Sequence, residues 1–217
     1  MKVYIITRFS IFDPTSTSYR LTRNSKSVEQ YKKVLFSKQR LSYKFTVFET
    51  ITLPSIVQQT YKNFEWHIYT SSYLPEFYKK RLLYITKQFP YIKVFFIESF
   101  SQFNTITFQD NYCTIRLDDD DGLYPTFFEL LQQYKNITNS IISFPKGRKC
   151  SIIQNKIVYG KPFIYKKIAA GLCAINMNIY NCGNHDLLDK KYKVLYNMKP
   201  NMYLLHCSIH CDTKRML

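Results

Sequence analysis

Short apolar runs alternate with longer helical segments in the first half of this chain, and this alternation limits the possible folds more than any other feature. The apolar runs are residues 2–7, 66–70, 92–97 and 112–117, and the helical segments are residues 28–61, 75–89 and 124–134. Strands that alternate with helices form parallel sheets. We therefore predict an α/β fold with a mainly parallel central sheet flanked by helices. In the first helical segment we expect a break or a kink at Pro54.

The second half of the chain follows a different pattern. Residues 140–144, 150–153 and 156–159 read as short strands joined by turns, more antiparallel than parallel. No linker-like stretch separates the halves, and 217 residues fit one α/β domain. We expect a single domain whose smaller C-terminal part is antiparallel.

The composition is that of a compact globular protein. Hydrophobic residues make up 46% of the chain and aromatic residues 17%, which excludes a disordered or low-complexity protein. No apolar stretch approaches the roughly 18 residues of a membrane span, and the N-terminus has no signal-peptide pattern. The six cysteines include no CxxC pair, so we expect buried free thiols. We predict a soluble protein of the cytoplasm.

The formal net charge of +16 has two interpretations. A basic surface attracts nucleic acid, anionic lipid or a phosphorylated substrate, whereas a skewed genome composition also enriches lysine. The basic residues are scattered along the chain, and no helix-turn-helix, zinc-finger or RNP pattern is present. We therefore expect no nucleic-acid partner.

Four consecutive aspartates occupy positions 118–121, directly after the apolar run 112–117. Adjacent acids at the end of a strand can converge on a hard cation that prefers oxygen ligands. The alternative is a helix start, but a cap needs only one acid and four like charges repel one another. The acids therefore predict a divalent-cation site with a phosphate as a further ligand. In open parallel sheets such a site lies at the carboxyl ends of the strands.

Several short motifs accompany these acids. In chain order they are Thr7-Arg8-Phe9, Phe48-Glu49, Leu53-Pro54-Ser55, Gln59-Thr60, Phe64-Glu65-Trp66 and the run from Arg116 to Asp121. Their order and spacing resemble those of GT-A type glycosyltransferases, and more narrowly those of a family of rhamnosyltransferases. The chain is also similar to the N-terminal domain of a chlorella-virus glycosyltransferase, which would place a viral protein in the host cytoplasm. The resemblance implies one GT-A-like domain, residues 1–217, with a nucleotide-sugar-binding half (1–123) and an acceptor-binding half (124–217).

The resemblance also implies a reaction. A hexose or deoxyhexose would move from a nucleotide-diphosphate sugar, with a UDP-sugar favoured, to a glycan or glycoprotein acceptor. In this fold a DXD motif holds Mn²⁺ or Mg²⁺, which neutralises the charge that grows on the leaving diphosphate. The pair is most simply Asp118 and Asp120, and Asp119 or Asp121 can replace either one. His206 is the candidate third metal ligand, with a hydrogen-bonded core histidine as the alternative.

Six residues are predicted to contact the nucleotide. These are Thr7, Arg8, Phe9, Ser71, Arg116 and Asp118. The alternatives are core packing for Phe9, helix capping for Ser71 and a structural ion pair for Arg116.

The catalytic base is predicted in the segment Gly183-Asn184-His185-Asp186, where many related transferases carry an acidic motif. Asp186 is the first candidate and His185 the second, because either can take the proton of an acceptor hydroxyl. The alternative is an aspartate that caps a helix beginning at Leu187.

Two other classes of function remain open on this sequence. A metal-dependent nuclease or nucleic-acid-binding protein would use the same acids together with the basic surface. A non-catalytic module would bind a sugar or Ca²⁺ without turnover.

Overall fold

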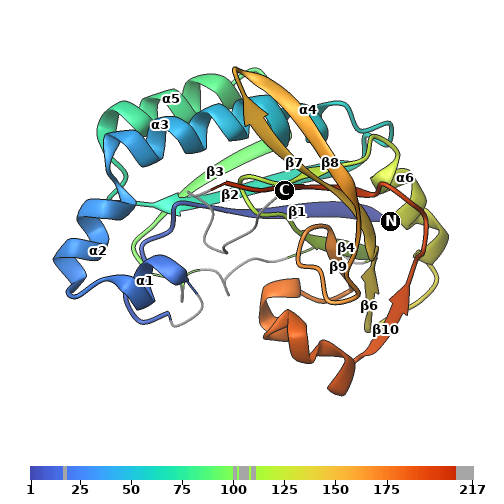
Figure 1. The fold of residues 1–217 in the computed structure, drawn as a ribbon. Coiled ribbons are helices and arrows are strands. Elements are labelled where there is room, and N and C mark those ends of the chain that lie inside the picture. Colours follow the sequence, from blue (N-terminus) through green and yellow to red (C-terminus); the bar gives the residue numbers. More distant parts are fainter. Residues whose placement is uncertain (17–18, 100–101, 103–107, 109–110, 209–217) are drawn as a thin grey trace.

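A seven-stranded sheet forms the centre of the molecule in the computed structural model, which describes residues 1–16, 19–99, 102, 108 and 111–208 (Figure 1). Its strands are β1 (Lys2–Phe9), β2 (Phe64–Ser71), β3 (Ile92–Ile97), β4 (Tyr112–Arg116), β6 (Ser140–Ser143), β9 (Leu172–Ile175) and β10 (Lys193–Tyr196). Their order is β10-β6-β9-β4-β1-β2-β3. Of these strands only β9 runs against its neighbours, β4 and β6. The predicted mainly parallel sheet is confirmed.

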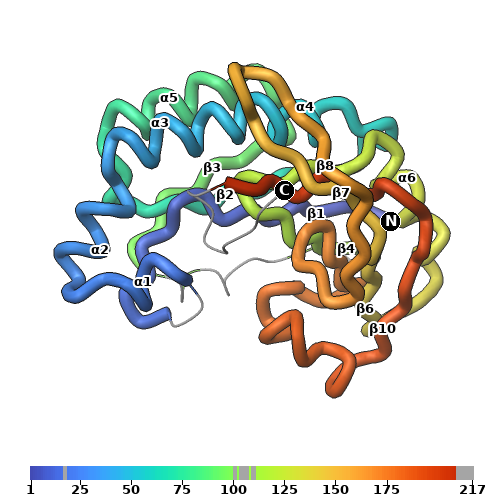
Figure 2. Tube along the Cα trace, in the orientation of Figure 1, coloured from blue at the N-terminus to red at the C-terminus, as the bar shows by residue number. Residues whose placement is uncertain are grey.

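A second, four-stranded sheet has the order β5-β11-β7-β8. It contains β5 (Gly122–Leu123), β7 (Lys146–Ile153), β8 (Lys156–Ile164) and β11 (Tyr203–His206). The β7–β8 and β5–β11 pairs are antiparallel, and the β11–β7 pair is parallel. Figure 2 shows that β11, late in the chain, runs beside β7. The smaller and mostly antiparallel part is therefore confirmed, and β7 and β8 are longer than the predicted strands 150–153 and 156–159. The predicted strand 140–144 is instead β6 of the central sheet, where it pairs with β10 in parallel.

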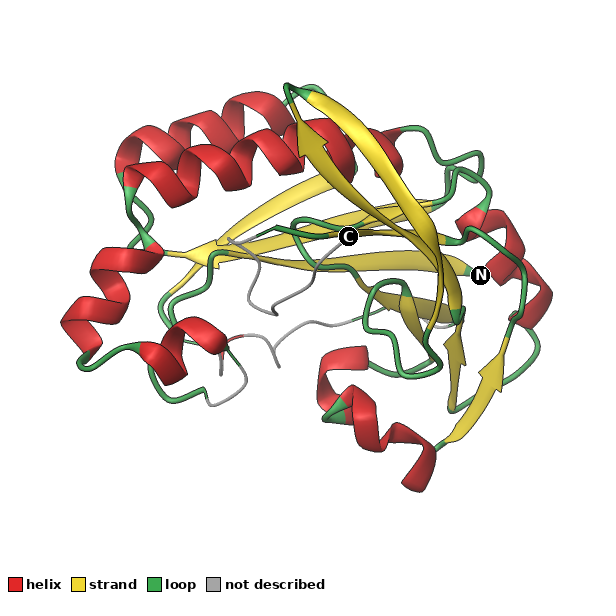
Figure 3. Ribbon diagram, viewed as in Figure 1, coloured by secondary structure: helices red, strands yellow, loops and turns green. Residues whose placement is uncertain are grey.

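The helices are concentrated in the first half of the chain, and α3 and α5 lie over one face of the central sheet (Figure 3). They are α1 (Arg20–Asn24), α2 (Val28–Leu35), α3 (Lys38–Val47), a π-helical turn (Phe48–Thr52), α4 (Leu53–Val57), α5 (Glu76–Thr86) and α6 (Phe127–Leu131). Among the described residues, 3₁₀ turns also span Gln132–Tyr134, Ile179–Cys182 and His185–Lys190.

The segment predicted as one helix over residues 28–61 is divided differently from the prediction. Its main separation falls between α2 and α3, where Ser37 is the N-cap of α3. The irregularity expected at Pro54 is the π-helical turn that ends just before α4. Pro54 itself is the second residue of α4, which continues directly from the π-helical turn because Thr52 and Leu53 keep right-handed helical backbone dihedrals.

One hydrophobic cluster joins both halves of the chain, from Val3 on β1 to Leu205 on β11. The side chain of Trp66 is fully buried within it. Five cysteines in the described residues are buried free thiols, as predicted, and Cys211 lies outside those residues. No helix in the described ranges is long and apolar enough to cross a membrane.

An ion cluster joins the first three strands of the sheet. Glu65 on β2 pairs with Lys2 on β1, and its carboxylate lies 2.6 Å from Lys93 Nζ on β3 and 3.2 Å from His67 Nε2. Burial by itself raises the pKa of Glu65, but these basic neighbours outweigh it and lower the pKa to about 2. The cluster therefore stabilises the folded chain at neutral pH.

Candidate active site

The carboxyl ends of β1 and β4 lie side by side, and their register decides which side chains meet. Ile6 is level with Arg116, so Arg8 is level with Asp118, two residues further along each strand. Because side chains alternate along a strand, these three polar side chains share one face of the sheet. Arg8 Nη2 lies 3.5 Å from Asp118 Oδ1, and Arg116 Nη2 lies 3.5 Å from Asp118 Oδ2. Asp118 is thus held between two guanidinium groups.

Thr7 and Phe9 lie on the opposite face of β1, in the core. Trp66 Nε1 donates a hydrogen bond to Thr7 Oγ1 at 2.9 Å. The ring of Phe9 packs edge-on against Phe45 and Phe48, with centroids 4.9 and 5.4 Å apart. Three consecutive strand residues cannot all line one pocket, so alternation separates these two predicted nucleotide contacts from Arg8.

Ser71 and His206 also have structural neighbours. Ser71 is buried, and its Oγ accepts the backbone N–H of Tyr73 at 3.1 Å in the turn after β2; it does not cap α5, whose N-cap is Pro75. His206 is buried on β11, and its Nε2 lies 3.1 Å from the hydroxyl of Tyr43.

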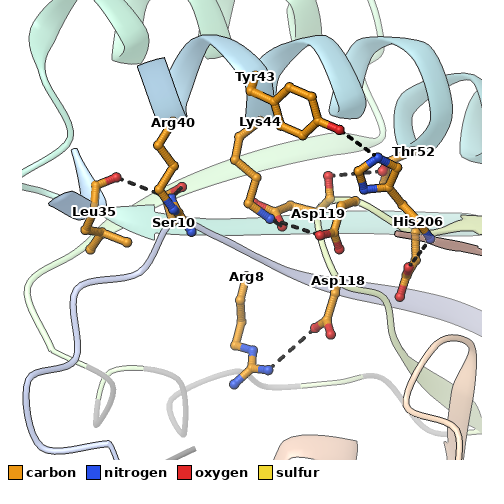
Figure 4. A network of polar contacts seen from close by, with 12 residues as sticks. Arg8, Ser10, Leu35, Arg40, Tyr43, Lys44, Thr52, Asp118, Asp119 and His206 are labelled. Carbon is orange, nitrogen blue, oxygen red and sulfur yellow. Dashed lines mark hydrogen bonds and ion pairs between the residues drawn. The ribbon is translucent and has the colours of Figure 1, made fainter. Parts of the chain in front are cut away.

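Helix α3 contributes two buried basic residues to this region, and Figure 4 shows Lys44 reaching Asp119 and Arg40 reaching Ser10 and the carbonyl of Leu35. Lys44 Nζ lies 2.5 Å from Asp119 Oδ1 and 3.3 Å from Asp120 Oδ2. Arg40, one turn earlier, donates to Ser10 Oγ and to a backbone carbonyl, each at 3.2 Å. Sequence reasoning missed both residues. The available signal was their four-residue spacing on a helix whose neighbouring positions are apolar.

The chain turns at the aspartates, and the rest of the protein holds this turn from several sides. The N–H of Asp121 donates to the carbonyl of Asp118 at 3.2 Å. Asp121 Oδ1 accepts the backbone N–H of His206 at 3.1 Å, and Thr52 Oγ1 donates to the carbonyl of Asp119 at 3.1 Å. We call residues 118–121 the acid turn. Each of its four carboxylates has a partner supplied by the protein.

Asp119 is the most constrained carboxylate on the cavity side of the acid turn. It is buried, and its Oδ2 has no hydrogen-bond partner. Burial raises the pKa of Asp119, the Lys44 ammonium opposes this effect, and Asp120 adds to it.

The residues that follow the acid turn are fixed by α4 and by Gln59 just after it. Gln59 Nε2 donates to the carbonyls of Tyr124 and Ser55 at 2.8 and 2.9 Å, and its Oε1 accepts the N–H of Phe128 at 3.1 Å. A Cβ at Gly122 would lie 3.2 Å from Ile51 Cγ2, so the backbone approaches the helical layer closely there. The motif residues Ser55 and Gln59 therefore support the site and do not line it.

A cavity of about 550 Å³ opens beside the acid turn. Six of the predicted site residues line it: Arg8, Arg116, Asp118, Asp120, His185 and Asp186. Four others, Thr7, Phe9, Ser71 and His206, are not among its lining residues. The structure therefore brings the predicted base segment and the acid turn, 62 or more residues apart in the chain, to one cavity.

Two tyrosines that the sequence did not single out complete the arginine side of this cavity. The ring centroid of Tyr180 lies 5.0 Å from Arg8 Cζ and 5.6 Å from Arg116 Cζ. The hydroxyl of Tyr19 accepts a hydrogen bond from Arg8 Nη1 at 2.8 Å. Aromatic faces and a hydroxyl thus fix the guanidinium groups in place. No local sequence pattern marks these tyrosines.

His185 and Asp186 differ in environment. His185 Nδ1 lies 2.7 Å from the carbonyl of Lys167, which can only accept, so Nδ1 carries the proton and Nε2 keeps its lone pair. Burial and the charge of Arg116 lower the pKa of His185, so its imidazole is neutral at neutral pH. The Asp186 side chain is half-buried, and its Oδ1 accepts from the hydroxyl of Tyr165 at 3.1 Å. Its N–H donates to Asn184, which caps the 3₁₀ turn.

The same geometry bears on metal ligation. Within the part of the chain that the structure describes, no group of three or more His, Cys, Asp or Glu side chains is placed to hold a metal ion. The predicted trio of Asp118, Asp120 and His206 is therefore not assembled. Mn²⁺ or Mg²⁺ needs only one or two protein carboxylates when a diphosphate completes its shell. The acid turn fits that smaller requirement, because Asp118 and Asp120 line the cavity and Asp119 Oδ2 has no partner.

The parallel sheet with acids at the end of β4 defines a GT-A-like protein, and comparison with solved structures agrees. The structure of S. aureus TarS 1-349 with UDP-GlcNAc matches with a TM-score of 0.50 at 8% identity, over 96% of this chain and 59% of that one. The complex of TarS 1-349 with UDP gives 0.51 at 9% identity, over 96% and 61%. A longer TarS structure gives 0.51 at 8% identity, over 96% and 37%. The chain thus spans about three fifths of the TarS 1-349 fragment.

The family assignment comes from the sequence. The family model described as "Putative rhamnosyl transferase" matches residues 2–216, and the chain belongs to this family of glycosyltransferases. A search of curated proteins returned no match.

Proposed function

We propose that this protein transfers a hexose or deoxyhexose from a nucleotide-diphosphate sugar to a glycan or glycoprotein acceptor. The observation that carries the proposal is the shared cavity, in which guanidinium groups and carboxylates face a neutral histidine and a half-buried aspartate. The family supports a deoxyhexose such as rhamnose. The UDP and UDP-GlcNAc complexes of TarS support a uridine donor.

The donor diphosphate would lie between β1, β4 and α3. Arg8 and Arg116 converge from the sheet, and their fork of N–H donors matches phosphate oxygens. Asp118 and Asp120, with Asp119 or Asp121 as substitutes, would hold a Mn²⁺ or Mg²⁺ ion that neutralises the charge on the leaving diphosphate.

The acceptor hydroxyl needs a proton acceptor, and two neighbouring residues qualify. His185 has a fixed tautomer with a lone pair on Nε2, and a lowered pKa keeps it unprotonated. Asp186 has more exposure and a tyrosine hydroxyl on one oxygen. The free lone pair of His185 suits a base, whereas the accessible carboxylate of Asp186 suits binding of the acceptor. His185 is therefore the stronger candidate for the base in this geometry.

A donor titration tests the proposal. UDP, GDP and dTDP would be titrated by calorimetry with and without Mn²⁺, and the corresponding sugars would be screened for nucleotide release. We expect metal-dependent binding of one nucleotide and its loss in Asp120→Ala. Glu76→Gln is the matched control, because that acid is exposed on α5 outside the cavity. Absence of nucleotide binding by the unmodified protein would refute the proposal, and steep salt-dependent binding of DNA or RNA would favour a nuclease.

A further inference from the structure

Lys44 places an ammonium group where the carboxylates of the acid turn would otherwise receive a metal ion. Its Nζ bridges Asp119 and Asp120 at 2.5 and 3.3 Å. The side chains of Lys44 and Asp119 are only 6% and 5% exposed. Figure 4 shows that Lys44 reaches Asp119 from α3, an element separate in the chain from the acid turn.

This arrangement changes the electrostatic argument for a metal. Four adjacent like charges call for a cation. Here Lys44 supplies one for Asp119 and Asp120, while Arg8 and Arg116 supply two for Asp118. A divalent ion on the same oxygens of Asp119 and Asp120 would lie within a few ångströms of the ammonium and be repelled by it.

A bound donor would bring a second anion, its diphosphate, close to Lys44. It lines the same cavity as Arg8, Arg40 and Arg116. A diphosphate in that cavity offers the ammonium new oxygen partners. Movement of Lys44 to the diphosphate would free Asp119 Oδ1. Because Asp119 Oδ2 has no hydrogen-bond partner in the structure, both oxygens would then be available to a metal ion.

We propose that Lys44 is a resident counter-ion that competes with the divalent cation for Asp119 and Asp120, and that the donor diphosphate draws it away. This inference rests on the proposed function. It makes metal and donor binding cooperative, because each favours the state in which Lys44 has left the acid turn. Lys44 acts here as a positioning residue. The metal alone binds weakly, and the metal with donor binds well.

The test is the affinity for Mn²⁺ alone, measured by calorimetry on the full chain without nucleotide. Lys44→Met should bind Mn²⁺ more tightly than the unmodified protein, by on the order of tenfold, because the competing charge is gone. Lys38→Met, an exposed lysine at the start of the same helix, should leave the affinity unchanged. Lys44→Arg keeps the charge and should keep weak binding. A general disturbance of the site would weaken Mn²⁺ binding, so the direction of the change separates competition from damage.

Removing Lys44 leaves Asp119 buried without its ion-pair partner, which threatens folding. A second comparison avoids this problem: Asp119→Asn against the double variant Asp119→Asn with Lys44→Met, in which Asp120 keeps its carboxylate. Tighter Mn²⁺ binding by the double variant supports the inference. Equal or weaker binding, or no binding in either, overturns it. Titration of UDP in the presence of Mn²⁺ reports separately on the proposed function, since a failure of the unmodified protein to bind UDP leaves the comparison of the Mn²⁺ affinities intact.

Discussion

Gln59 should be one of the side chains on which the stability of the site depends most, and Gln59→Leu tests this. Its amide is fully buried and makes three hydrogen bonds, to the carbonyls of Ser55 and Tyr124 and from the N–H of Phe128. Phe128 lies in the first turn of α6, where the helix itself offers no acceptor for its N–H. Leucine has a similar size and removes all three bonds.

The expected loss follows from these contacts. Each net hydrogen bond contributes about 1 kcal/mol, and a buried peptide group left unpaired costs about 1 to 3 kcal/mol. The carbonyls can relax more easily than the N–H, so we expect unfolding free energy to fall by about 2 to 4 kcal/mol. Because Tyr124 comes soon after the acid turn, nucleotide affinity should fall as well.

Urea unfolding followed by circular dichroism provides the measurement, and the adjacent Gln58→Leu is the control. Gln58 is exposed and carries the same side chain, so its replacement should change stability by less than about 0.5 kcal/mol. A loss below about 1 kcal/mol in Gln59→Leu, or equal losses in both variants, would refute the reasoning.

Three further variants test other parts of the structure. Glu65→Gln should lower the unfolding free energy by about 1 kcal/mol at pH 7 after allowance for solvent screening. Because the pKa of Glu65 in the folded protein is lowered to about 2, urea titrations should show the stabilities of the variant and the unmodified protein converging as pH falls from about 4.3 towards 2. A stability difference that persists at pH 2 contradicts the assignment. Gly147→Ala puts a Cβ 2.3 Å from the buried ring of Tyr203, so thermal unfolding should shift by an amount equivalent to about 1 to 3 kcal/mol, and an unchanged midpoint argues against the packing. With His185 as the base, kcat should fall on the acid side only below pH 6.5, since the lowered pKa of His185 keeps its imidazole neutral to lower pH. If the same acid-side fall of kcat remains in His185→Gln, another group is responsible for it.

The sequence was informative where the determinants are local. Alternation of apolar runs and helices predicted the parallel sheet, and the acids were placed at the end of β4 because a polar run directly follows that strand. Strand alternation also contained information that was not used: it puts Arg8 on one face of β1 and its neighbours Thr7 and Phe9 on the other. Because successive side chains of a strand point to opposite faces, Thr7 and Phe9 cannot contact a nucleotide that Arg8 contacts.

Contacts between distant segments could not be derived from the sequence. Lys44 meets Asp119 across 75 residues, and Asp121 meets the backbone of His206 across 85. Both depend on how α3 and β11 pack around the acid turn. A lysine on an amphipathic helix is usually a solvated residue, so its burial follows only from the tertiary structure. The same limit applies to Tyr180, whose ring meets Arg8 across the cavity.

The partners of the four aspartates give a physical argument about the register of the DXD pair. Asp121 is almost fully buried and bonded to the β11 backbone, and Asp119 is buried against Lys44 with its carbonyl held by Thr52. Asp118 and Asp120 keep more exposure, with side chains 28% and 14% exposed, and both line the cavity. The turn thus separates Asp121, which anchors the backbone, from three acids that line the cavity, of which Asp119 is the most buried and the most closely paired with Lys44. Their greater exposure supports Asp118 and Asp120 as the ligands while Lys44 stays in place, and Asp119 becomes a further ligand only when Lys44 has left it. Asp121 holds the turn against β11.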